Sequence, residues 1–154
     1  MNRAQRRQQE KAARSGRSSL STATLGQALE HLQRGKLKRA EGLLARILKV
    51  NSTHPDALHY QGVVMYQQGR YQESIKHLSA ALSAAPDYAE AHNSLCIVLM
   101  EQRNYDEAIS HAEQALKIRP DFSGAHANLG NAYQEQGELG RAVASYRTAL
   151  AFDP

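Results

Sequence analysis

A pattern that recurs every 34 residues constrains this chain more than its composition does. Prolines stand at intervals of 34 residues, at Pro86, Pro120 and Pro154. Side chains that are mostly small recur with the same interval in three sets: Ala28, Gly62, Cys96 and Gly130; Ala40, Ser74, Ala108 and Ala142; and Ile47, Ala81, Ala115 and Ala149. A unit of this length cannot bury an apolar face alone, so copies stack and bury it between them. The pattern therefore predicts a row of stacked units.

Within each interval the apolar residues predict two helices. Leu25, Leu29 and Leu32 lie at i, i+4 and i+7, which is the spacing of one face of an amphipathic helix. Gly35 interrupts this spacing, and it resumes from Leu37 to Leu48. We therefore expect an all-α chain with a repeat array over residues 20–154, divided into units at 21–54, 55–88, 89–122 and 123–154.

The last interval contains the clearest motif. It reads His126-Ala-Asn-Leu129-Gly130-Asn-Ala-Tyr133 and continues with Ala142, Tyr146, Ala149 and Pro154. This resembles the tetratricopeptide repeat family, whose helix–turn–helix unit is about 34 residues long, with His126 where the family prefers Trp. The first interval departs further, because Gln27 and Ala28 replace Leu-Gly and Ser52 replaces the closing Pro. The resemblance implies a right-handed α-solenoid of about four repeats, in which the first helix of each pair lines the concave face.

The front of the chain differs from the rest in charge. Residues 1–20 carry six Lys or Arg and one acid, whereas residues 55–154 carry seven basic and twelve acidic side chains. Residues 1–19 hold almost no large apolar side chain, so we expect a disordered basic tail. Its role stays open between a solubilising end, an arm for an anionic partner and a transit peptide, the last weakened by Glu10.

Composition excludes several classes of protein. A single cysteine, Cys96, excludes an intramolecular disulfide framework and a multi-cysteine zinc site, and it fits a reducing compartment. No apolar run approaches the roughly 20 residues of a membrane span, and no secretory signal follows the first Met. We therefore expect a cytoplasmic location and no membrane span.

The sequence does not favour catalysis or a cofactor. His92 shares a register with His126, and His77 shares one with His111, as duplication would produce. Equivalent side chains on stacked helices lie roughly 8–10 Å apart, too far for the roughly 2 Å ligand distances of zinc. The chain has no Gly-rich phosphate loop and no nucleophile elbow. Cys96 is expected to be a buried structural thiol, and no metal or cofactor is expected.

The resemblance places a partner-binding groove on the first helices of the repeats. Its lining is expected to include Leu25, Leu29, Leu32, His59, Val63, Tyr66, Asn93, Ile97, Met100, Ala127, Asn131 and Gln134. The middle of this set is apolar and aromatic with a flexible Met, which suits a peptide or a helix of another protein. The family's clamp for a C-terminal carboxylate would use Leu25, His59, Asn93 and Ala127, which lack its lysine. The family's asparagine ladder would use Gly26, Tyr60, Ser94 and Asn128, of which only Asn128 matches.

Three functional hypotheses follow. The preferred one is a non-catalytic protein–protein interaction scaffold. The alternative is the N-terminal substrate-recognition module of a larger glycosyltransferase, similar to O-GlcNAc transferase, or of a sulfotransferase, since a front end like MNRAQRR before degenerate repeats resembles such bacterial proteins. The third is RNA binding by the basic tail, which the acidic body disfavours. The family ends its arrays with an extra polar helix, and none follows Pro154 here, so Val143, Tyr146 and Leu150 are expected to face water on one side. This predicts further repeats, a covering partner or self-association, with a short, frayed monomer as the remaining alternative.

Overall fold

The computed structural model describes residues 3–154, with the side chains of residues 3–8 and 21–154. Within these residues every regular element is an α-helix, so the all-α class predicted from the sequence is confirmed. The chain divides into two compact units, residues 1–52 and residues 53–154. Each unit is described separately below.

The first unit is a hairpin of two helices. Helix α1 spans Arg3–Gln33 and α2 spans Leu37–Val50, and they pack through Ala28, Ala40 and Leu44, which are at most 1% exposed. The segment expected to be disordered over residues 1–19 is therefore helical from Arg3, and residues 1–2 lie outside the described part. The segment is rich in Ala, Arg and Gln, which favour helix, and it extends an existing helix, so no new nucleation is needed.

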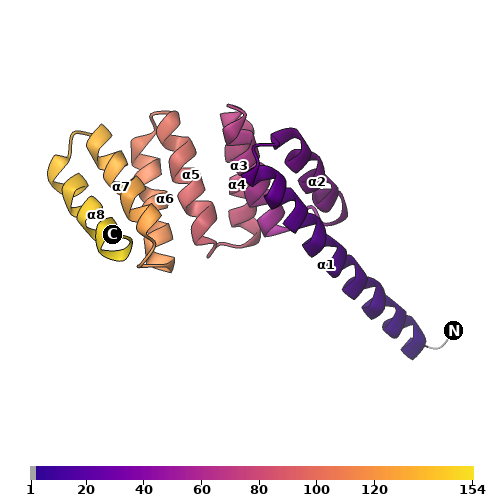
Figure 1. Ribbon diagram of the computed structural model, residues 1–154. Helices are drawn as coiled ribbons and strands as arrows, with labels where there is room; N and C mark the ends of the chain where they lie inside the picture. Colours follow the sequence, from indigo (N-terminus) through magenta and orange to yellow (C-terminus); the bar gives the residue numbers. More distant parts are fainter. Residues whose placement is uncertain (1–2) are drawn as a thin grey trace. The chain divides into compact units, whose positions relative to one another are not determined.

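The second unit is a row of three helical hairpins (Figure 1). Its helices are α3 (Pro55–Gln67), α4 (Tyr71–Ala84), α5 (Ala89–Glu101), α6 (Tyr105–Ile118), α7 (Ser123–Glu135) and α8 (Leu139–Phe152). The closest packing lies within the hairpins α3–α4, α5–α6 and α7–α8. Helix α5 then packs on α4, and α7 packs on α6, which joins the hairpins into one stack. Each hairpin thus covers the apolar face of the one before it.

The turns inside the hairpins share one backbone conformation. Gly35, Gly69 and Gly137 have φ values of 68°, 74° and 78°. In the first hairpin of the second unit, Gly69 N–H donates to Tyr66 O and Arg70 N–H donates to Met65 O, both at 2.9 Å. These bonds satisfy carbonyls at the end of α3, and the left-handed residue lets the chain reverse at once into α4. The sequence predicted the interruption at Gly35, which lies at the equivalent turn of the first unit.

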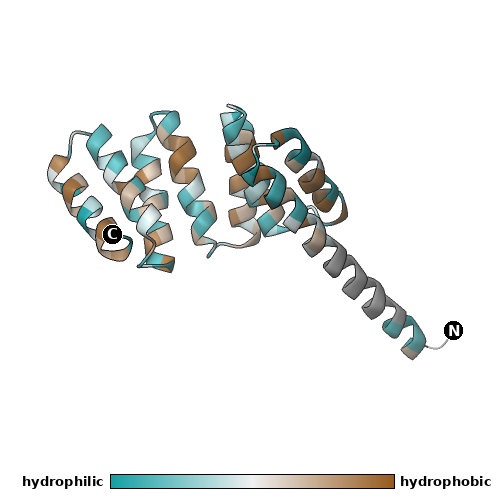
Figure 2. Ribbon diagram, viewed as in Figure 1, coloured by the Kyte–Doolittle hydropathy of each residue, from teal (hydrophilic) through white to brown (hydrophobic). Residues whose placement is uncertain are grey.

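A cluster of buried side chains runs through α4 to α8 of the second unit. Its buried members are Leu78, Leu95, Cys96, Val98, Leu99, Ala108, Ala112, Leu129, Tyr133 and Ala142. Figure 2 shows α5 with a strongly apolar stretch, which corresponds to the uninterrupted run Leu95–Met100. Because α5 contacts α3, α4, α6 and α7, a helix that is apolar on most sides suits the centre of the stack.

Candidate functional site

The candidate binding surface of the second unit is formed by the first helices of its hairpins, α3, α5 and α7. Helix α5 contacts both α3 and α7 directly, so these three helices present neighbouring faces. The predicted groove residues of this unit all lie on them. Leu25, Leu29 and Leu32 lie half-buried on α1 in the first unit, and their place in the groove stays a prediction.

A cavity of about 230 Å³ opens between α3, α4 and α5. Three of the predicted groove residues, Val63, Tyr66 and Ile97, line it, together with Gln67, Ser74, Leu78, Ser94 and Val98. The floor is apolar because Leu78 and Val98 are buried core residues. The sequence pattern therefore placed three side chains that the structure brings together around one mostly apolar cavity.

His59 was expected to line the groove, but it is buried, with 5% of its surface exposed. Its Nε2 lies 2.9 Å from Ser94 Oγ, and its Nδ1 lies 3.2 Å from Tyr88 OH. Burial lowers the pKa of His59, although Glu90 and Asp56 partly oppose this shift. The ring is therefore neutral at pH 7 and joins α3 to α5 and to the loop before it.

Hydrogen bonds between neighbouring first helices follow a regular spacing. Besides His59 and Ser94, Asn128 Nδ2 donates to Asn93 Oδ1 at 2.8 Å, and Tyr66 OH donates to Glu101 Oε1 at 3.3 Å. Each pair is separated by 35 residues, one more than the repeat. Ser94 and Glu101 were not among the predicted groove residues, and this spacing is the signal that would have identified them.

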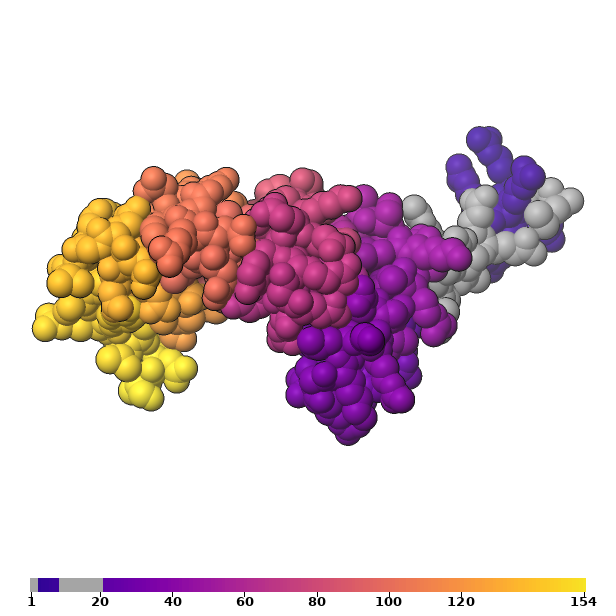
Figure 3. All heavy atoms as spheres, turned by 90° about the horizontal axis from the view of Figure 1, so that it is seen from above, coloured from indigo at the N-terminus to yellow at the C-terminus, as the bar shows by residue number. Residues whose placement is uncertain are grey.

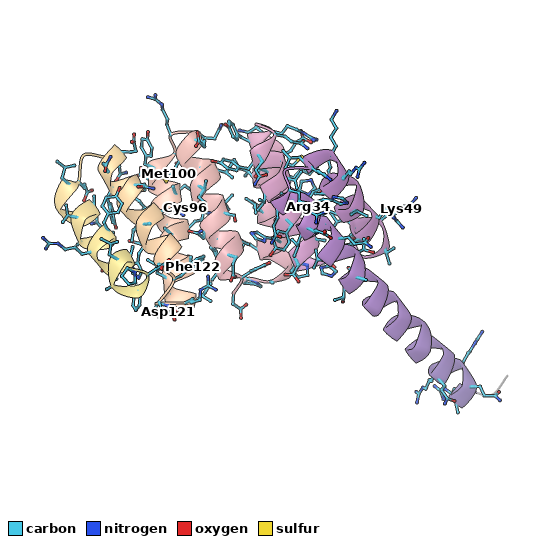
Figure 4. All side chains as sticks on the ribbon, in the orientation of Figure 1. Arg34, Lys49, Cys96, Met100, Asp121 and Phe122 are labelled. Atoms are coloured by element: carbon cyan, nitrogen blue, oxygen red, sulfur yellow. The ribbon has the colours of Figure 1, made fainter. Side chains whose placement is uncertain are left out.

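The remaining predicted residues differ in their surroundings. Tyr146 OH donates to Asn131 Oδ1 at 2.7 Å and to Gln134 Oε1 at 3.2 Å, so both exposed side chains are engaged by α8. Ala127 is half-buried, and Met100 packs against the core cluster. Figure 4 labels Met100 and Cys96 on α5. The open part of the surface therefore lies around Val63, Tyr66 and Ile97.

The Ser94–His59 contact pairs a hydroxyl with a neutral imidazole, as a nucleophile and its base would be paired. Ser94 lies inside α5, where backbone N–H groups bond within the helix. They cannot also stabilise an oxyanion, which acyl transfer requires. We therefore assign the pair to helix packing.

Cys96 is fully buried, and burial raises its thiol pKa to about 12. A thiol with so high a pKa is a poor nucleophile at neutral pH. Among the described residues, no group of three or more His, Cys, Asp or Glu side chains is placed to hold a metal ion. No helix in the described part of the chain is both long and apolar enough to cross a membrane.

Comparisons with known proteins agree with this architecture. Models described as tetratricopeptide repeats match residues 25–89 and residues 99–154. Among solved structures, PilF of Pseudomonas aeruginosa is 24% identical with a TM-score of 0.84, covering 90% of this chain and 63% of its own. A structure of MamA is 24% identical with a TM-score of 0.77, covering 86% and 78%.

A mutant of the O-GlcNAc transferase of Thermobaculum terrenum is 27% identical with a TM-score of 0.74. The match covers 76% of this chain but only 22% of the transferase. No curated protein sequence matches the chain significantly. The similarity to PilF and MamA, at 24% identity, concerns the fold alone.

Proposed function

Because the chain belongs to the tetratricopeptide repeat family, we propose that it is a protein–protein interaction scaffold that binds a peptide or helix of another protein. The binding surface is the face of α3, α5 and α7 around Val63, Tyr66 and Ile97. The observation that supports this most directly is the cavity of about 230 Å³ at this face. An engineered protein cavity of about 150 Å³ binds benzene, so the space here suits one large apolar side chain, such as Leu, Met or Phe.

The charge around the cavity indicates what flanks that side chain. Residues 55–154 carry five more acidic than basic side chains. Glu101 accepts a hydrogen bond from Tyr66, which lines the cavity, and Asp56 lies in the first turn of α3. Glu90 is already paired with Arg119 at 2.6 Å. Complementary charge speeds encounter and selects partners, so the preferred segment has Lys or Arg on either side of its apolar side chain.

Peptide selection on the immobilised 154-residue chain tests this function. A library of random peptides, each about a dozen residues long, should yield binders that share an apolar residue flanked by Lys or Arg. Ile97→Trp fills the cavity with an indole and should weaken their binding by about tenfold or more, measured by fluorescence anisotropy. Ile118→Trp, at a residue 38% exposed on α6, is the matched control and should change little.

Two results would contradict this function. One is a set of selected peptides that bind Ile97→Trp, Val63→Ala and Tyr66→Ala as tightly as the unmodified chain, with circular dichroism showing all variants folded. The other is a selection dominated by acidic peptides without an apolar residue. His59 is unsuitable as a probe, because its burial couples any substitution to folding.

A second candidate function is the substrate-recognition module of a larger transferase. The similarity to a bacterial O-GlcNAc transferase supports it, as does the Asn93–Asn128 pair. In that pair Asn93 Nδ2 and Asn128 Oδ1 stay available to donate to and accept from a peptide backbone. The reading frame beyond residue 154 is the test. A stop codon directly after Pro154 would remove this candidate and leave the scaffold unaffected.

A further inference from the structure

Helix α8 has an exposed apolar stripe. Leu139, Val143 and Leu150 are 63%, 47% and 62% exposed. They lie at i, i+4 and i+11 and therefore project from one face of the helix. In Figure 3 the yellow atoms of α8 form an uncovered outer surface at the end of the second unit.

The same positions are covered in the inner hairpins. The residues equivalent to Val143 and Leu150 are Ile75 and Leu82 on α4, and Ile109 and Leu116 on α6. All four are partly buried and pack against the core cluster, with α5 lying on α4 and α7 on α6. The stripe on α8 is therefore the same kind of surface as two interfaces that the molecule already contains.

The outer face of α8 differs from those interfaces in its polarity. At the inner interfaces Gln72 donates to Gln102 at 3.1 Å, and Gln136 donates to Asp106 at 2.6 Å. The position of Gln72 and Asp106 is taken by Gly140 on α8. The neighbouring exposed positions are Ala144 and Ala151, with Arg147 as the one charge between them. Apart from Arg147, these positions hold no polar side chain for a partner to match, and the small residues let the backbone of a partner come close.

We propose that this face of α8 pairs with α8 of a second copy of the chain. The stripe Leu139, Val143, Tyr146 and Leu150 has the alternating spacing of four, three and four residues that is typical of a helix–helix seam. An antiparallel pair related by a two-fold axis places Leu139 opposite Leu150 of the other copy and opposes the two helix dipoles. The surface is then its own complement, as a closed dimer requires.

Head-to-tail association with α1 is disfavoured by the residues of α1. The positions equivalent to Leu95 and Val98, which are buried on α5, are Gln27 and Glu30 on α1. Both are exposed, and Glu30 is paired with Arg34 at 2.8 Å. Covering them with the leucines of α8 would desolvate a carboxylate without a new partner. The α8 faces of two copies therefore pair with each other, and the assembly stops at two copies.

The small size of this face sets the strength of the dimer. Helix α8 has 14 residues, and a helix of that length is about 21 Å long. One face of such a helix buries less accessible surface than the roughly 800 Å² that each partner buries in a stable complex. We therefore expect a reversible dimer that appears as the concentration rises, with the 17.0 kDa chain approaching twice its mass.

Sedimentation velocity over a concentration series tests the pairing. Leu150→Glu should weaken dimerisation by about tenfold or more, because it buries a carboxylate against Leu139 of the other copy, where it has no partner. Val50→Glu on α2 is the matched control, since Val50 is also 62% exposed, and it should leave dimerisation unchanged. Leu139→Lys, at the other end of the stripe, should act like Leu150→Glu. All three positions are exposed, and circular dichroism checks that each variant folds.

A cysteine crosslink identifies the surface. Val143 lies opposite Tyr146 of the other copy in this pairing, so the two Val143 positions are close but not in contact. Val143→Cys should therefore give a covalent dimer with a short thiol-reactive bifunctional linker, whereas the unmodified chain should not, because its Cys96 is buried. A chain that stays monomeric at every concentration would overturn the proposal, as would masses that grow beyond two copies. Dimerisation that Leu150→Glu and Val50→Glu affect equally, or a dimer that Val143→Cys does not trap, would also overturn it.

Discussion

The hairpins α3–α4 and α5–α6 fill the same space in opposite ways. In α3–α4 the first helix contributes Gly62 and the second contributes Leu78, which is completely buried. A Cβ added to Gly62 would lie 2.6 Å from Leu78 Cγ, so the leucine occupies the space that the glycine leaves. In α5–α6 the equivalent residues are Cys96 and Ala112, both completely buried. The larger side chain has moved to the first helix.

This difference indicates that the chain preserves the combined volume of a pair of residues. Gly130 and Tyr146 follow the α3–α4 solution, since a Cβ on Gly130 would lie 2.7 Å from Tyr146 Cε1. Ala28 and Leu44 occupy the same positions in the first unit, and both are 1% exposed. Close packing in protein interiors makes each member of such a pair depend on the other. Single substitutions should therefore destabilise, and paired ones should compensate.

The largest effect is expected when the α5–α6 pair is moved into α3–α4. Leu78→Ala should lower the free energy of unfolding by about 2–5 kcal/mol, because it removes a buried leucine and leaves a cavity. Gly62→Cys alone should cost about 1–3 kcal/mol through overpacking. The double variant should be more stable than the sum of the two changes by at least about 1 kcal/mol. Urea unfolding of all four proteins measures this coupling, and strictly additive changes would show that volume is not shared.

A smaller effect of about 1–3 kcal/mol is expected for Gly130→Ala. Its new methyl group meets the ring of Tyr146, which hydrogen bonds to Asn131 hold in place. Gly140→Ala in the same hairpin is the matched control, because nothing lies within 4 Å of its added Cβ. It should stabilise by about 0.5–1 kcal/mol, since Ala favours helix more than Gly. Thermal unfolding that moves in the same direction for both variants would contradict the steric argument.

The sequence predicted the helices better than it predicted the surface. The 34-residue interval located the paired helices and the small positions, because both depend on local periodicity. It did not predict that His59 is buried, since that depends on Tyr88 and Ser94 from other parts of the chain. It also did not reveal that Arg103 takes the turn position that Gly35, Gly69 and Gly137 take elsewhere, because side-chain identity there gives no signal.

That turn gives a third prediction, expected at about 1 kcal/mol or less. Arg103 has a φ of 57°, a left-handed conformation that costs a residue with a Cβ about 1–2 kcal/mol. Arg103→Gly removes this strain from the folded state. Part of the stability gained is offset, because glycine loses more conformational entropy on folding than arginine. The free energy of unfolding should therefore rise slightly, whereas Gly69→Arg should lower it. A loss of stability in Arg103→Gly would mean that the arginine makes a stabilising contact that exceeds the strain.

The same two hairpins also differ in how they hold a histidine, because His59 is buried and His111 is half-buried. His59 of α3 contacts Ser94 and Tyr88, whereas His111 of α6 contacts His92, with 3.0 Å between their Nδ1 atoms. His92 Nε2 faces the carbonyl of Pro86 at 3.1 Å, so that nitrogen must carry a proton. The Nδ1 of His92 then accepts from His111 when His92 is neutral. If both rings carried an added proton, the Nδ1–H groups of His92 and His111 would face each other and repel.

This arrangement predicts a stability that falls as the solution becomes acidic. Burial lowers the pKa of His59, and the carboxylates of Glu90 and Asp56 oppose this shift. Burial also lowers the pKa of His111, His92 lowers it further, and the carboxylate of Glu107 opposes the shift. Between each folded pKa and the unfolded value of 6.5 the unfolded chain binds more protons. Stability is therefore complete above pH 6.5 and lost as the pH falls through the folded values. Melting temperatures at pH 7.5 should exceed those at pH 5, and the slope should be shallower in His111→Gln. An unchanged slope in His111→Gln would mean that His111 does not contribute to the acid response.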